Sequence, residues 1–382
     1  MKNSQFLLLL IFLTLHSFQT QAQTWEKTID TPTQDFVSAL ISLPNDKLGI
    51  IIARADISNP NLFTTVSNSE LIVIDKKTGN IKKQATFKSS DFVPNLDSSI
   101  MLMDMTFGWY DSPNIHGYAM VRLDTPSTYT KVFFELDSNL NLIRSNHQDT
   151  LVGMLPIYRR FKNINQNVYF VGSLLEFGAD DTGVFGSLTD SLREKNINRF
   201  FDSSKQLFIT NVYDFLVDKN KNKYLIGEAD LNPIQLVKLD SLNQIVDTMF
   251  ISHPLLNDVH VIESGSVSAY WSDDSTFIIS AVGSILNTNL ERMGDLHLFK
   301  YDTNFNFLRY RRPWTRDSSE HASFALSTVF DSICDCFYTG MTRHVDPISS
   351  PFGTGDTTDF KLVKFDKDLN VLFERSYRRD AT

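Results

Sequence analysis

Short apolar or alternating segments, each ended by a polar turn, recur along the whole chain. In one recurring pattern an apolar strand ends in Asp, and a turn containing Asn and a second strand follow. The Asp positions of successive copies are 62, 53, 50, 62 and 64 residues apart. A repeat of this length favours an architecture of similar units stacked side by side. The copies lie at 71–75, 132–137, 185–190 (a degenerate copy), 236–240, 298–302 and 362–366.

A second pattern precedes each copy of the first. It is a short apolar strand, often opened by an aromatic residue and closed by Gly, and another strand-like segment lies before it. Each unit therefore supplies about four short strands, and segments with helical periodicity are almost absent. Four antiparallel strands repeated six times predict an all-β fold, a β-propeller of six four-stranded blades. The second pattern occupies 49–52, 117–121, 169–172, 224–227, 277–280 and 337–340.

Other architectures fit the spacing less well. An array of β-sandwiches has units near 100 residues, and the coils of a β-helix are much shorter than these units. A fragment that lacks a seventh blade remains open. Segment 25–29 resembles the outer strand 372–377, so it either adds a fifth strand to the last blade or replaces that strand.

The units resemble those of exported bacterial β-propeller repeat proteins. In that family a Gly-Tyr-apolar-Gly strand precedes a Lys-x-Asp-x-x-x-Asn hairpin, which matches segments 300–306 and 364–370 here. The resemblance covers nearly all of the chain after residue 22. It implies a propeller built from structural repeats that carry no activity by themselves. Many relatives end in a C-terminal secretion sorting domain, which we expect to be absent because the sequence stops after its last predicted strand.

The first 22 residues have the three parts of a secretory signal peptide. Lys2 provides the positive start, segment 6–15 is apolar, and small residues precede a cut after Ala22. We therefore expect a signal peptide at 1–22 and one propeller domain at 23–382. The predicted location is secreted, meaning periplasmic, cell-surface or extracellular, with no membrane insertion after signal cleavage.

Composition narrows the classes of partner and cofactor. The chain is 42% hydrophobic and 21% charged, and its formal net charge is −9, which gives no electrostatic reason to expect nucleic acid. Its 30 Phe residues are explained by packing between blades, so no cofactor is predicted. A protein or a glycan is the expected partner, and the sequence does not predict an oligomeric state.

The Asp-x-Asn-x-Asn turns match the first half of a calcium-binding EF-hand loop and then depart from it. Leu142, Phe307 and Val371 stand where that loop needs Gly. We predict hydrogen-bonded hairpin turns in which Asp accepts backbone N–H groups and Asn takes the left-handed conformation, and no metal site. Cys334 and Cys336 share one predicted strand face, where a direct disulfide is possible but disfavoured.

The longest irregular segments predict where a ligand binds. They connect the second and third strands of three units, so they lie on one face of the ring, and loops carry function more often than scaffolds do. No nucleophile, zinc or phosphate-binding motif was found, so we expect a binding or interaction module more than an enzyme. The alternative is a propeller-type polysaccharide hydrolase or lyase, which requires carboxyl groups or His clustered at the axial channel. The candidate ligand-binding residues are Arg54, Asp56, Arg292, Arg343, His344 and Asp346.

Overall fold

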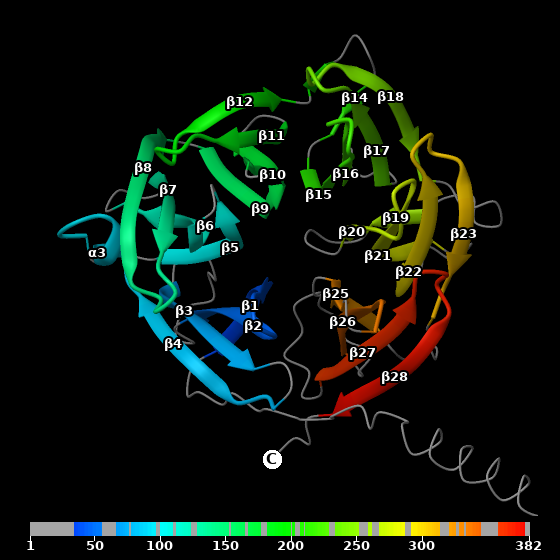
Figure 1. The fold of residues 1–382 in the computed structure, drawn as a ribbon, viewed down its shortest axis with the longest axis horizontal. Coiled ribbons are helices and arrows are strands. Elements are labelled where there is room, and N and C mark those ends of the chain that lie inside the picture. Colours follow the sequence, from blue (N-terminus) through cyan, green and yellow to red (C-terminus); the bar gives the residue numbers. More distant parts are fainter. Residues whose placement is uncertain are drawn as a thin grey trace, which may run out of the picture.

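In the computed structural model, six antiparallel sheets stand around a common axis as the blades of a β-propeller (Figure 1). The prediction of an all-β, six-bladed propeller is confirmed. The structure describes residues 34–55, 66–75, 78–96, 100–109, 112–123, 128–152, 154–164, 167–176, 182–199, 201–202, 207–209, 211–228, 234–251, 259–261, 267–286, 292–313, 321–325, 328–331, 334–344 and 358–378. The predicted signal peptide and segment 25–29 lie outside these residues.

Each blade is one stretch of chain that runs from an inner strand at the axis to an outer strand at the rim. The first three blades are β1 (Gln34–Leu43), β2 (Lys47–Ala55), β3 (Val66–Asp75) and β4 (Ile81–Phe87); β5 (Ile100–Trp109), β6 (Ser112–Arg122), β7 (Thr128–Leu136) and β8 (Leu142–Val152); β9 (Met154–Ile164), β10 (Asn167–Glu176), β11 (Thr182–Leu188) and β12 (Glu194–Arg199).

The fourth blade is again a simple four-stranded sheet, whereas the inner strands of the fifth and sixth blades are each divided into two pieces. These blades are β15 (Asn211–Val217), β16 (Lys223–Glu228), β17 (Ile234–Leu239) and β18 (Ile245–Phe250); β19 (Val259–Val261) with β20 (Val267–Trp271), β21 (Thr276–Leu286), β22 (Arg292–Asp302) and β23 (Phe307–Arg311); β24 (His321–Ala325) with β25 (Val329–Asp331), β26 (Cys336–His344), β27 (Thr358–Asp366) and β28 (Val371–Arg378). Along the chain, a small hairpin, β13 (Phe201–Asp202) and β14 (Leu207–Phe208), follows the third blade, and a short helix, α3 (Ser89–Phe92), follows the first. None of the helices in the described residues is long and apolar enough to cross a membrane.

Aromatic side chains fill the spaces between blades. Tyr118 of the second blade lies 4.8 Å, centroid to centroid, from Tyr158 of the third, and both are buried. Between the fourth and fifth blades, Tyr224 contacts the rings of Trp271 and Phe277. Such tilted and edge-on contacts add to the free energy gained by removing large apolar surfaces from water. The Phe-rich composition therefore corresponds to blade-to-blade packing.

The repeated Asp and Lys positions also have structural roles. Asp302 Oδ1 accepts the amide hydrogens of Asn304 and Asn306 at 2.8 and 2.9 Å, and its Oδ2 accepts the Asn306 side-chain amide at 2.8 Å. In the fourth and fifth blades, the Lys two residues before the Asp reaches the next blade: Lys238 Nζ donates to the carbonyl oxygen of Thr303 at 2.8 Å. Lys300 Nζ does the same to the carbonyl of Lys367 at 3.0 Å. The motif therefore closes its own hairpin and connects neighbouring blades.

One detail of these turns differs from the prediction. The left-handed conformation falls on Leu140 (φ 69°), Phe305 (φ 62°) and Leu369 (φ 60°), and only the fourth-blade turn places it on Asn243 (φ 63°). Leu140, Phe305 and Leu369 are buried at these positions. Burial of these side chains compensates for a backbone conformation that is unfavourable for any residue with a Cβ.

Candidate axial binding site

A cavity of about 480 Å³ lies at the centre of the ring. Its lining comes from the inner strands β1, β5, β9 and β20, which belong to the first, second, third and fifth blades. The blades form a ring (Figure 1), and blades on opposite sides of a ring meet only at its axis. The cavity is therefore axial. The lining residues with polar side chains include Ser42, Asp104, Thr106, Arg160, Lys162 and Tyr270.

Two buried aspartates hold successive inner strands together. A register shift between Leu102 and Asp104, and another between Val212 and Asp214, interrupts the pairing of the inner strand with its neighbour. Such a bulge redirects the side chain that follows it. Asp104 Oδ2 accepts the amide hydrogen of Phe161 in the third blade at 2.8 Å. Asp214 in the fourth blade likewise accepts a backbone amide hydrogen of the fifth blade. The same arrangement therefore occurs in the second and fourth blades.

Lys162 joins the third blade to the fourth and fifth. Its Nζ lies 2.6 Å from Asp214 Oδ1, and it donates to the carbonyl oxygens of Phe215 at 2.8 Å and Ala269 at 3.4 Å. A Lys ammonium has three donors, so these three partners use its capacity. Burial lowers the pKa of Lys162, and the carboxylate of Asp214 opposes that effect. Lys162 is therefore a fixed part of the cavity wall.

Among the described residues that line the cavity, Arg160 is a cation that retains hydrogen-bonding capacity. Among the described residues it makes one hydrogen bond, from Nη2 to Ser268 Oγ at 3.2 Å. A guanidinium has five N–H donors in a planar fork, which suits bidentate contact with a carboxylate. Its side chain is partly exposed and lines the cavity. A ligand that enters the cavity thus meets a guanidinium that the described residues engage with one hydrogen bond.

The charge of the cavity depends on the proton of Asp104. Burial raises the pKa of Asp104 to about 6, although Arg160 and the hydrogen bond from Phe161 act in the opposite direction. The nearby Asp214 carboxylate adds to the increase. Above this pH the Asp104 carboxylate balances Arg160. Below it Asp104 is neutral, and the cavity gains one net positive charge.

The ligand-binding residues predicted from the long loops, where the structure describes them, lie at the ends of second and third strands and not on the inner strands that line the axial cavity. Arg54 is the second-to-last residue of β2, and Arg292 is the first residue of β22. Arg343 and His344 are the last two residues of β26. These backbone positions all flank connections between second and third strands, so they share one face of the ring. The structure describes the backbone of these four residues and not their side chains, and Asp56 and Asp346 lie outside the described residues. Whether they contact a ligand stays a prediction.

The axial cluster has no recognisable motif in the sequence. Asp104 and Asp214 each stand alone inside an apolar strand, where a single polar residue usually faces solvent. Arg160 and Lys162 have the spacing of two residues that share a strand face. The sequence contains one signal for the cluster, which is a charged residue in the middle of the first strand of a unit. Because the first strand of each unit is the inner strand and inner strands line the axis, such a residue indicates an axial position.

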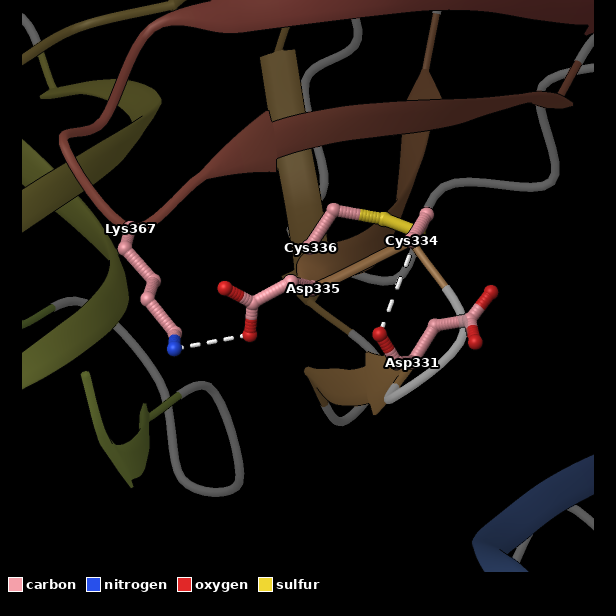
Figure 2. Close-up of a disulfide and its surroundings, with 5 residues drawn as sticks. All are labelled: Asp331, Cys334, Asp335, Cys336 and Lys367. Carbon is pink, nitrogen blue, oxygen red and sulfur yellow. Dashed lines mark hydrogen bonds and ion pairs between the residues drawn. A yellow bond between two sulfur atoms is a disulfide. The ribbon is translucent and has the colours of Figure 1, made fainter. Parts of the chain in front are cut away.

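The structure joins Cys334 and Cys336 in a disulfide, which the sequence disfavoured (Figure 2). The sequence placed both cysteines on an extended strand. In the structure, Cys334 and Asp335 form the turn between β25 and β26, and Asp335 has φ 50°. The turn sets the Cα atoms 5.2 Å apart, within the range that a disulfide spans. The cysteine sulfurs and Asp331 are also close enough to surround a metal ion, but the disulfide engages both sulfurs.

The fold and the axial cavity define a six-bladed β-propeller with a charged central pocket, and comparison with known proteins adds likeness of fold alone. No protein-family model matches the chain, and no curated protein matches it. An α-L-arabinofuranosidase from Fusarium graminearum, a mutant in complex with an iminosugar inhibitor, matches with a TM-score of 0.52 and 9% identity, over 86% of this chain and 93% of that one. A periplasmic gluconolactonase from Pseudomonas aeruginosa gives 0.47 and 9%, over 90% and 88%. A member of the DUF4221 family from Bacteroides vulgatus gives 0.34 and 10%, over 92% and 86%. The resemblance to exported propeller repeats has no sequence match behind it and stays a prediction.

Proposed function

We propose that the chain is an exported binding module whose axial cavity holds the acidic end of a glycan. Arg160 carries this proposal, because it lines the cavity and uses one hydrogen bond among the described residues. A carboxylate on a sugar ring satisfies the planar guanidinium with two parallel hydrogen bonds.

The remaining lining suits the rest of a sugar. Thr106 and Ser42 bring hydroxyl groups to the cavity wall, and the Tyr270 ring provides an aromatic surface. A volume of about 480 Å³ is within the range of small-molecule sites and accommodates one or two sugar rings. Polar groups around a partly apolar pocket are what orient a small ligand.

The N-terminal segment supports export, because residues 1–22 have the form of a signal peptide. On this ground we infer that the protein works in the periplasm, at the cell surface or outside the cell.

The alternative, a polysaccharide hydrolase or lyase, would use Asp104 and Asp214 as its acid and base. A raised pKa for Asp104 suits a general acid. Against this, each carboxylate has one oxygen engaged by the backbone of the next blade, and Asp214 is also paired with Lys162. A carboxylate held in this way is better suited to connecting blades than to transferring protons to a substrate.

The test is a calorimetric titration of residues 23–382 with oligogalacturonate, with maltotriose as the neutral control. We expect saturable binding of the acidic oligomer and weaker or undetectable binding of maltotriose. Chromatography of the same mixtures after long incubation tests the alternative, since a hydrolase or lyase shortens the oligomer and a binding module leaves it intact. Binding of neither sugar would overturn the proposed ligand class.

A further inference from the structure

We propose that Cys334 and Cys336 form a reversible redox pair that exchanges with thiols, independently of the axial cavity. The two cysteines are separated by Asp335 alone, so the disulfide closes one of the shortest possible loops. The stabilisation that a disulfide gives a fold grows with the length of the loop it closes. A bond of this kind therefore contributes little to holding the propeller together.

The turn is also held without the disulfide. β25 pairs with β26 at three positions, including Asp331 with Cys336, and the rings of Phe330 and Phe337 lie 5.0 Å apart. Lys367 Nζ, in the turn between β27 and β28, lies 2.7 Å from Asp335 Oδ1 (Figure 2). These contacts keep the two cysteines at the same place whether the sulfurs are joined or not.

The two sulfurs differ in access, which gives exchange a direction. Cys334 is exposed, whereas Cys336 is fully buried at the start of β26. An attacking thiolate therefore reaches Cys334. Exposed disulfides are the ones that exchange most readily, because access limits the attack on sulfur.

A second cavity, of about 400 Å³, borders this turn. Phe330 and Lys367 line it together with Trp271 and residues of the turns that follow β15 and β20. Phe330 precedes Asp331 in β25, and Lys367 is the partner of Asp335. The cavity gives a thiol-bearing molecule a place to lie near this turn. Its wall combines the rings of Trp271 and Phe330 and the Lys367 ammonium with the carboxylates of Asp218, Asp273 and Asp274.

The exchange proceeds in two balanced steps. A substrate thiolate attacks Cys334 Sγ, a new S–S bond forms, and the Cys334–Cys336 bond breaks with its electron pair on Cys336, which takes a proton from water. A second thiolate of the substrate then attacks its own sulfur in the mixed disulfide and releases Cys334. The substrate is oxidised by two electrons and the cysteine pair is reduced by two. Oxidised glutathione returns the pair to the disulfide by the reverse steps.

The experiment equilibrates the folded chain, residues 23–382, in a series of buffers with different ratios of reduced to oxidised glutathione. Acid quenching, alkylation and mass spectrometry measure the fraction of each form. We expect both forms to be populated within the series and the change to reverse when the ratio is reversed. A pair that stays oxidised in every buffer while the protein is folded would overturn the proposal. The same is true of a pair that is reduced only when the protein unfolds.

Two single variants test the direction of attack. Cys336→Ser leaves the exposed thiol and Cys334→Ser leaves the buried one. We expect Cys336→Ser to form a mixed disulfide with oxidised glutathione at least about tenfold faster than Cys334→Ser. A circular-dichroism melting curve on each variant establishes that both are folded. Equal rates in two folded variants, or a faster reaction of the buried thiol, would contradict the assigned direction.

Discussion

Asp214 Oδ2, in the inner strand of the fourth blade, accepts the amide hydrogen of Ala269 in the inner strand of the fifth at 2.7 Å. Its other oxygen lies 2.6 Å from Lys162 Nζ of the third blade. One fully buried carboxylate thus connects three consecutive blades at the axis. Removing it leaves an amide hydrogen without its acceptor and an ammonium group without its counter-charge.

We predict that Asp214→Ala lowers the free energy of unfolding by about 3–5 kcal/mol, which is the usual cost of removing one partner of a buried ion pair. Asp214→Asn retains an acceptor for the Ala269 amide, so it is expected to cost about 1 kcal/mol less. Urea denaturation measures both. The control is Asp247→Ala on the outer strand β18, where the side chain is exposed and a change within about 0.5 kcal/mol is expected. Equal effects for Asp214→Ala and Asp247→Ala would show that the axial carboxylate does not connect the blades.

The raised pKa of Asp104 predicts that an acidic ligand binds more tightly at lower pH. Below about pH 6 Asp104 is neutral and no longer balances Arg160, while the carboxylates of oligogalacturonate remain ionised. We expect the affinity to rise by about three- to tenfold between pH 7.5 and pH 5, which corresponds to a shift of up to about one pKa unit on binding. Calorimetric titrations at both pH values measure this. Asp104→Asn should abolish the difference, and affinity that falls toward pH 5 in the wild type would contradict the charge balance described above.

The same proton has a defined effect on stability. The pKa of Asp104 in the folded protein, about 6, is above the value of 3.8 for an unburied Asp carboxyl, so the folded state binds this proton more tightly than the unfolded state. The stabilisation is fully present below pH 3.8 and is lost as the pH rises through 6. Comparing unfolding of the wild type with Asp104→Asn across this window isolates the contribution, because the Asn variant lacks the titration. Parallel curves for the two proteins would contradict the raised pKa.

The repeated turns should be independent of calcium. Partial burial raises the pKa of Asp302, but hydrogen bonds from Asn306 and Asn304 hold it below its usual range. The carboxylate is thus satisfied within the turn. We expect the melting temperature to change by less than about 1 °C with excess calcium or with EDTA. Asp302→Ala should lower the free energy of unfolding by about 1 kcal/mol through the lost hydrogen bonds. A calcium-dependent increase in melting temperature that Asp302→Ala reduces would identify the turn as a metal site after all.

The Cys334–Cys336 disulfide should matter little for stability. Because it closes a loop of three residues, the double variant Cys334→Ser/Cys336→Ser is expected to lose no more than about 2 kcal/mol of unfolding free energy. Urea denaturation of the wild type under oxidising conditions provides the reference. A loss near 4 kcal/mol would mean that the bond is a structural connection, which would remove the premise of the redox proposal.

The sequence predicted what depends on neighbouring residues. Period-two strands and the turns after Asp240, Asp302 and Asp366 are local features, and their repetition was enough to define six blades. The Lys of the same motif could be recognised but not interpreted, because its acceptor is a carbonyl group about 65 residues away, as for Lys238 and Thr303. Bonds between blades are invisible in a single repeat.

The axial cluster was beyond sequence reasoning for a similar reason. Arg160 and Ser268 are 108 residues apart, and the bulges that aim Asp104 and Asp214 at the next blade have no motif of their own. The disulfide depended on a left-handed backbone at Asp335, a conformation that is uncommon outside Gly and that no neighbouring residue in the sequence indicated. The sequence instead directed attention to the long loops, whose side chains lie outside the described part of the chain.

A calorimetric titration of Arg160→Gln with oligogalacturonate tests most directly whether Arg160 holds an acidic ligand in the axial cavity. The matched control is Arg309→Gln, which removes an arginine from the outer strand β23, where Nη2 donates to Asn370 Oδ1 at 2.9 Å. We predict that Arg160→Gln weakens binding at least about tenfold, the loss of one charge-assisted contact, while Arg309→Gln binds as the wild type does. Wild-type affinity in a folded Arg160→Gln protein would show that Arg160 does not hold the ligand.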